Sequence, residues 1–92
     1  MYRVILSRRY KTSLKRISRG KNFDHQLLEE IISMLARGDK LETKYRDHQL
    51  SGELKGYREC HIQGNLLLMY QKYEDVLILL LVDLGTHDEL FR

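Results

Sequence analysis

The spacing of apolar residues changes along the chain, and each spacing predicts a different element. Residues 2–6 are mostly β-branched or aromatic, which is typical of a short strand. Apolar residues then recur at helical spacing in two segments, which predicts helices over 8–19 and 25–37. Ser7 and Asp24 precede these segments as N-caps. The first half of the chain therefore predicts one strand followed by two helices.

The last third of the chain predicts three strands, over 54–62, 65–73 and 76–82. The third of these is apolar at every position, as expected of a strand that is covered on both faces. Thr86 follows as the cap of a short C-terminal helical turn. The polar stretch 39–53 has no clean period, and we expect an ordered loop there. Ordered loops of this length are more often functional than idle.

These elements follow one another as β-α-α-β-β-β, which predicts an α+β fold. We expect an antiparallel sheet packed against the two N-terminal helices, with the short helical turn at the end. Within 54–62, Cys60 and Ile62 are expected to point into the core. Tyr57, Glu59 and His61 then share the opposite face of that strand.

Length and composition narrow the class of protein. The 92 residues, 42% hydrophobic and 32% charged, fit one globular domain over 1–92. No apolar run approaches the roughly 20 residues of a membrane span, and no signal peptide is expected. Cys60, the single cysteine, rules out an internal disulfide and suits a reducing cytoplasm. No spacing of a structural zinc site or of a nucleotide-binding loop is present, so neither a metal nor a cofactor is expected.

Positive charge is concentrated at the start of the chain. Residues 1–21 hold eight of the 16 Lys and Arg residues and none of the 13 Asp and Glu residues. This asymmetry favours a surface for RNA, DNA or an acidic protein. An ordinary solvated helix face is the alternative interpretation. Charge alone does not decide between the two.

Three histidines in the second half are candidates for acid and base catalysis. His48, His61 and His87 lie in different elements, and a convergent set would supply a general base and a general acid. Taken singly, each is more simply a polar surface residue. Their neighbours favour a phosphate-handling site, because four cations flank them: Lys44, Arg46, Lys55 and Arg58.

Three motifs in this half resemble the YafQ branch of the RelE/ParE toxin superfamily. They are D-H-x-L-x-G at 47–52, G-Y-R-E-C-H-I at 56–62 and G-T-H-x-E-L-F at 85–91. Members of this family are toxins of bacterial type II toxin–antitoxin operons, and YafQ-like toxins cut messenger RNA in the ribosomal A site. The resemblance thus implies a RelE-like fold and an endoribonuclease that arrests translation.

The resemblance also implies roles for individual residues. His48, His61 and His87 would be catalytic, and Phe91 would lie at the C-terminal end of the site. The ribose 2′-hydroxyl would attack the adjacent phosphate without a metal or cofactor, leaving a cyclic phosphate and a free 5′-hydroxyl. His87 is our candidate for the acid, and His48 or His61 for the base.

The family's partners give the basic N-terminal third a function. Its bases would dock on ribosomal RNA or on an acidic segment of a cognate antitoxin. That antitoxin is expected to be DinJ-like, with a ribbon-helix-helix part, so that operator DNA is bound only through the complex. No membrane partner is expected. The predicted docking residues are Arg8, Arg9, Lys11, Lys15, Arg16 and Arg19.

Two departures from the family pattern bear on catalysis. Asn65 and Leu66 stand where the family commonly has aspartate and tryptophan. Asp83 stands where it commonly has an arginine aimed at the phosphate. An aspartate there would repel the phosphate charge. The alternative function is therefore a non-hydrolytic module on the same fold, either a ParE-like gyrase inhibitor or a weakened toxin kept as a co-repressor.

Overall fold

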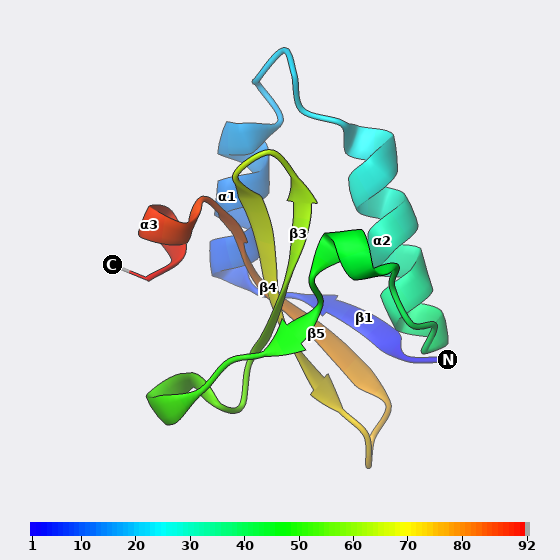
Figure 1. Cartoon of the computed structure of the whole chain (residues 1–92). Coiled ribbons are helices and arrows are strands. Elements are labelled where there is room, and N and C mark those ends of the chain that lie inside the picture. The colour runs from blue at the N-terminus through cyan, green and yellow to red at the C-terminus, as the bar shows by residue number, and fades with distance from the viewer. Residues whose placement is uncertain (92) are drawn as a thin grey trace.

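The computed structural model describes residues 1–91. Figure 1 shows the order of the elements along the chain. The five strands are β1 (Arg3–Leu6), β2 (His48–Gln49), β3 (Arg58–Gln63), β4 (Leu66–Tyr73) and β5 (Ile78–Gly85). The helices are α1 (Arg8–Ile17), α2 (His25–Arg37) and α3 (His87–Leu90), with single 3-10 turns η1 (Thr43–Tyr45) and η2 (Gly52–Leu54).

The sheet has the strand order β1-β5-β4-β3-β2. Neighbouring strands from β5 to β2 run antiparallel, whereas β1 lies parallel to β5 at the edge. The α+β fold is confirmed, with the two-residue β2 added to the predicted β-α-α-β-β-β order. The predicted antiparallel pairing is confirmed from β2 to β5. The edge strand β1 is parallel to β5, because no hairpin joins the two and they are free to align in parallel.

Both long helices begin at their predicted caps. The Ser7 hydroxyl accepts the Tyr10 backbone N–H at 2.9 Å, and Asp24 accepts the Leu27 N–H at 3.0 Å. Helix α2 has the predicted bounds, and Gly38 ends it in the left-handed conformation with φ 82°. Helix α1 ends two residues earlier than predicted. The Ser18 and Arg19 amides, which follow the helix, donate to carbonyls of its last turn and close it.

The main core lies between these helices and one face of the sheet. Leu28, Ile31 and Leu35 of α2 pack there with buried residues of β3, β4 and β5. Cys60 and Ile62 belong to this core, as predicted. Burial raises the pKa of the Cys60 thiol, an effect that nearby acidic groups reinforce. This thiol is therefore a packing group and not a nucleophile.

Three predicted boundaries are wrong. The strand predicted over 54–62 begins only at Arg58, since η2 and a turn occupy the residues before it. The predicted loop 39–53 contains β2 and both 3-10 turns. The apolar run 76–82 is not a strand throughout: Val76 and Leu77 form the β4–β5 turn and are 60% and 47% exposed. A tight turn takes priority there, and Leu77 adopts φ 53° to make it.

Helix α3 lies on the other side of the strands from α2 (Figure 1). It packs on the second face of the sheet, where Leu90 joins Leu67 and Met69 in a small apolar cluster. Among residues 1–91, no helix is long and apolar enough to cross a membrane. The sheet therefore has one face covered by two long helices and a second face covered in part by α3.

A core truncation tests this division into two faces. Leu68 is fully buried in the main core, and Leu68→Ala is expected to lower the free energy of unfolding by about 3 kcal/mol. Val76→Ala is the matched control, because this exposed residue should change stability by less than about 0.5 kcal/mol. Urea denaturation measures both. Equal losses for the two variants would contradict the assigned core.

Candidate active site

Strand β3 presents two acid–base side chains to the α3 side of the sheet. Its residues alternate between the faces, so Glu59 and His61 lie opposite the buried Cys60. In the register with β4, Glu59 is paired with Met69 and His61 with Leu67. The Leu67 and Met69 side chains contact α3. Glu59 and His61 are thus placed next to the helix that carries His87.

A pocket of about 260 Å³ lies between β3 and α3. His61 and His87 both line it, so the structure brings two of the three predicted catalytic histidines together. Four polar groups surround them: the carboxylates of Glu59 and Asp88, the Thr86 hydroxyl and the Asn65 amide. The full lining is Glu59, His61, Gly64, Asn65, Leu67, Thr86, His87 and Asp88.

The third histidine reaches this pocket through Glu59. Strand β2 pairs with β3 so that His48 is opposite Glu59, and His48 Nε2 lies 3.3 Å from Glu59 Oε1. His48 Nδ1 lies 2.5 Å from the backbone oxygen of Arg46. Each ring nitrogen therefore faces an oxygen acceptor. The His48 ring is thus held between the Arg46 carbonyl and the Glu59 carboxylate.

Glu59 is the buried acid at the base of the pocket. Its side chain is 8% exposed, and only Oε1 has a partner. Oε2 is buried and accepts no hydrogen bond from any described residue. Buried carboxylate oxygens are normally hydrogen-bonded. Among the described residues, Glu59 Oε2 is thus a buried side-chain oxygen without a hydrogen-bond partner.

The short helix α3 orients His87. Thr86 and Glu89 form a reciprocal capping box, in which Thr86 Oγ1 accepts the Glu89 N–H at 3.3 Å and Glu89 Oε1 accepts the Thr86 N–H at 2.8 Å. The Phe91 ring lies 4.7 Å from the exposed His87 ring. Phe91 therefore lies beside His87, although it is not among the residues that line the pocket.

The predicted phosphate-binding cations are mostly elsewhere. Lys44 is the nearest, since it lines an adjoining pocket of about 310 Å³ together with His61 and Gly64. Arg46, Lys55 and Arg58 line other pockets. Arg58 is next to Glu59 on the same strand and so points to the opposite face of the sheet. The structure does not bring these three bases to the histidines.

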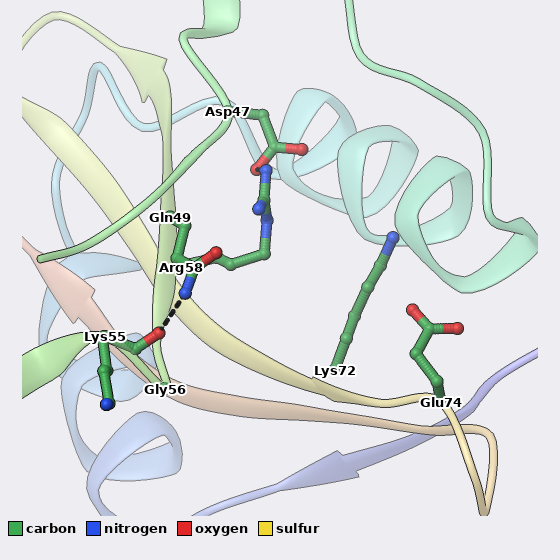
Figure 2. A pocket seen from close by; sticks show the side chains of 7 residues that line it. All are labelled: Asp47, Gln49, Lys55, Gly56, Arg58, Lys72 and Glu74. Atoms are coloured by element: carbon green, nitrogen blue, oxygen red, sulfur yellow. Dashed lines mark hydrogen bonds and ion pairs between the residues drawn. The ribbon is translucent and has the colours of Figure 1, made fainter.

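Arg58 instead belongs to a network beside a second pocket of about 410 Å³ (Figure 2). Arg58 Nη2 lies 3.4 Å from Asp47 Oδ1, and Arg58 Nε donates to the Tyr70 hydroxyl at 3.2 Å. That hydroxyl donates in turn to Asp47. Burial opposes the charge of Arg58, but Tyr70 and Asp47 outweigh it and raise the pKa of Arg58. Burial, together with Asp47, raises the pKa of Tyr70 as well.

This network fixes the segment that carries His48. Asp47 directly precedes His48, so anchoring the Asp47 carboxylate to Tyr70 and Arg58 holds the backbone of β2 in place. Sequence analysis missed this role for Asp47 and Tyr70. The sequence offers one signal for it, the acidic residue directly before the first motif histidine. Strand β2 has only two residues, which is too short to show the alternating pattern of a strand.

Comparison with known proteins identifies the family. Residues 2–92 match the family described as "Bacterial toxin of type II toxin-antitoxin system, YafQ". The chain belongs to the YafQ toxin family. The mRNA interferase toxin YafQ of Escherichia coli is 33% identical over 77 residues, which are 83% of this chain and 82% of that protein. A Haemophilus influenzae relative is 64% identical over 31 residues, only 34% of this chain and 30% of that relative.

Solved structures of the family share the fold. A metal-bound toxin from Helicobacter pylori has a TM-score of 0.90 at 41% identity, covering 99% of this chain and 100% of that one. YafQ in the Escherichia coli DinJ-YafQ complex has a TM-score of 0.87 at 25% identity, with 100% of both chains covered. In residues 1–91 of the present chain, no three His, Cys, Asp or Glu side chains are grouped to hold a metal ion.

The two departures from the YafQ pattern occupy different places. Asn65 lines the pocket, whereas Leu66 packs against the main core. Asp83 is 4% exposed, is not among the residues that line the pocket, and forms an ion pair with Arg9 of α1 at 2.6 Å. The expected repulsion between Asp83 and a bound phosphate is therefore reduced, because a cation neutralises this carboxylate.

The Tyr70 hydroxyl provides a test of the anchor that holds β2. Tyr70→Phe removes the donor to Asp47 and the acceptor of Arg58, and should lower the free energy of unfolding by about 1–3 kcal/mol. Tyr73→Phe is the matched control, because the Tyr73 hydroxyl is exposed and bonds only to Gln71. Chemical denaturation of both variants measures the difference. If Tyr70→Phe were as stable as the wild-type protein, the network would not stabilise the position of β2.

Proposed function

We propose that this chain is the toxin of a type II toxin–antitoxin system, an mRNA interferase that cuts messages on the ribosome. One observation carries the proposal: His61 and His87 line one pocket, with the buried Glu59 and its partner His48 beside them. Two imidazoles that line one pocket suit a reaction that needs a base and an acid. The mRNA interferase activity named for the Escherichia coli relative supports the same chemistry.

The pocket residues divide the steps of the reaction among them. His61 has no hydrogen-bond or ion-pair partner among residues 1–91, so it is free to take the proton of the ribose 2′-hydroxyl. The 2′-oxygen then bonds to the adjacent phosphorus, and the bond from phosphorus to the 5′-oxygen breaks. His87 gives its proton to that 5′-oxygen. The products are a 2′,3′-cyclic phosphate and a free 5′-hydroxyl.

His48 and Glu59 support this exchange from beside the pocket. Because the Arg46 carbonyl and the Glu59 carboxylate already occupy the two ring nitrogens of His48, we assign His48 a supporting role and not that of the base. Glu59 holds the His48 ring through Oε1. No metal or cofactor enters these steps.

The exposed bases of α1 are proposed to contact ribosomal RNA. Four of the six predicted docking residues form no ion pair or hydrogen bond through their side chains within the described chain, and they are free to contact phosphates: Arg8, Lys11, Lys15 and Arg19. Such contacts would bring the pocket to a message held in the A site. Binding of this kind weakens steeply as salt rises.

A DinJ-like antitoxin is proposed as the neutralising partner. The Escherichia coli relative of the same fold has been solved as a DinJ-YafQ complex. The basic surface of α1 suits an acidic antitoxin segment that folds on binding. Operator DNA would then be bound through the ribbon-helix-helix part of that antitoxin and not by this chain. We place the protein in the cytoplasm, where both the ribosome and the antitoxin are found.

A second function is a binding module on the same fold. One observation favours it, since the described lining of the histidine pocket contains no Lys or Arg and does contain two carboxylates, Glu59 and Asp88. A pocket with this charge would stabilise a transition-state phosphate poorly. The protein would then act by binding, either to its antitoxin as a co-repressor or to DNA gyrase.

Cleavage of a defined message on programmed ribosomes tests the leading proposal. Purified protein should cut the message only when the ribosome is present, and primer extension maps the cuts. His87→Ala removes the proposed acid and should slow cleavage by about 100-fold or more without unfolding the protein. Naked message and His25→Ala, which alters an exposed histidine of α2, are the controls.

The outcomes separate the two functions. Full cleavage by His87→Ala would remove His87 from the mechanism. No cleavage by the folded wild-type protein, with ribosome or antitoxin binding retained, would favour the binding module. Induction of a DNA-damage response on expression, with translation intact, would indicate gyrase.

A charge-removing substitution tests the role of Glu59. Glu59→Gln keeps the size of the side chain but removes the carboxylate that contacts His48, and is expected to slow cleavage by about 10- to 100-fold. Glu53→Gln in η2 removes an exposed charge and should leave the rate unchanged. Single-turnover cleavage on programmed ribosomes gives both rates. Equal rates for the two variants would show that Glu59 takes no part.

A further inference from the structure

The predicted docking bases of α1 are of two kinds. Arg8, Lys11, Lys15 and Arg19 make no side-chain contact with a polar group among residues 1–91. Arg9 and Arg16 are engaged within the fold, and both contact segments next to His87. Arg9 and Arg16 lie seven residues apart, which places them on one face of the helix. This face is directed at β5 and α3.

Arg9 bridges β5 and the end of α3. Its Nε lies 2.6 Å from Asp83 Oδ2, and its Nη2 donates to the Leu90 carbonyl at 3.3 Å. Asp83 also accepts the Ser13 hydroxyl at 2.6 Å and the Leu84 N–H at 2.8 Å. A buried carboxylate with three donors is a rigid anchor, because removing its cation would leave a buried charge unpaired. The guanidinium thus ties the last carbonyls of α3 to a fixed point.

Arg16 contacts the beginning of the same helix. Its Nη1 lies 2.9 Å from Glu89 Oε2, while Glu89 Oε1 accepts the Thr86 N–H in the capping box. One carboxylate therefore joins α1 to the residue directly before His87. Gly85 fits this arrangement, because a Cβ there would lie 3.0 Å from Glu89 Oε1. The two arginines together contact both ends of α3.

Helix α3 depends on such contacts for its position. It has four residues, far fewer than the dozen or more that an isolated helix needs to be stable in water. Only Leu90 is buried, and it packs against Leu67 and Met69. Phe91, just beyond the helix, packs against the same cluster, so the apolar contacts gather at the C-terminal end of α3. The other end, which carries the exposed His87 ring, depends on further contacts for its position.

We propose that Arg9 and Arg16 are positioning residues that hold α3 and thereby place the His87 ring over the pocket. The catalytic part of this statement rests on the proposed function, whereas the structural part does not. Helix α1 accordingly has two separate tasks. Three of its bases, with Arg19 just beyond its end, have no partner among residues 1–91, whereas Arg9 and Arg16, each about half exposed, contact the segments next to His87.

Hydrogen exchange of α3 amides tests the structural part without any substrate. The Leu90 and Phe91 amides bond to the Thr86 and His87 carbonyls, so their protection reports on this helix. Arg16→Gln should speed their exchange about two- to fivefold, the range of a partly exposed ion pair. Arg9→Gln should speed it more, because Asp83 is buried. Arg8→Gln is the matched control on the same helix and should leave the exchange rates of these two amides unchanged.

A double variant keeps the test of Arg9 possible if the single variant does not fold. If Arg9→Gln alone unfolds the protein, Arg9→Gln combined with Asp83→Asn removes the buried charge as well and still breaks the bridge to Leu90. Arg16→Lys keeps the charge at Glu89 and should restore most of the lost protection. Unchanged protection of Leu90 and Phe91 in both glutamine variants would overturn the proposal.

Cleavage kinetics on programmed ribosomes test the catalytic part. Misplacing a reacting group lowers turnover and leaves docking intact, so Arg16→Gln should lower kcat about tenfold with an unchanged KM for ribosomes. Arg8→Gln should instead raise KM alone. Faster amide exchange with an unchanged kcat would overturn the positioning role. If the wild-type protein does not cleave at all, the proposed function fails, and the exchange measurement alone decides whether α1 holds α3.

Discussion

The alternation of side chains along β3 determines most of what the molecule can do. Consecutive residues of this strand point to opposite faces, so the requirement that Cys60 and Ile62 fill the main core forces Glu59 and His61 onto the other face. The register with β4 then places Leu67 beside them, and Leu67 provides the apolar contact for α3. A shift of one residue would bury both acid–base groups under the long helices. The pocket therefore exists because the core is packed in this register.

Three carboxylates then locate the segments that carry the other histidines. Asp47 bonds to Tyr70 and Arg58 and thereby fixes β2, the two-residue strand that carries His48. Glu59 binds the His48 ring, and Asp83 holds Arg9 against the last turn of α3. Asp47 and Asp83 are each paired with an arginine, and Glu59 contacts an imidazole. Short elements with little apolar surface are thus positioned by ionic contacts, while the long helices and strands are positioned by packing.

This division explains how much the sequence alone could predict. Segments with a clear period were predicted well, including α2 to the residue and the two faces of β3. Strand β2 and the exposed position of Leu77 were missed, because two residues have no period and turn geometry can override an apolar run. The meeting of His61 with His87 was expected only from family resemblance. The engagement of Arg9 and Arg16 could not be predicted, since an arginine paired across the fold and one facing solvent look the same in a sequence.

The electrostatic effect of Asp83 depends on its ion pair with Arg9. An isolated aspartate there would repel a phosphate, but at 2.6 Å the guanidinium cancels most of its field at longer range. The pair thus removes a repulsion without supplying a cation to the pocket. In the described lining, imidazoles are the groups that can carry positive charge. Position 83 therefore gives the pocket neither the attraction of an arginine nor the repulsion of a free carboxylate.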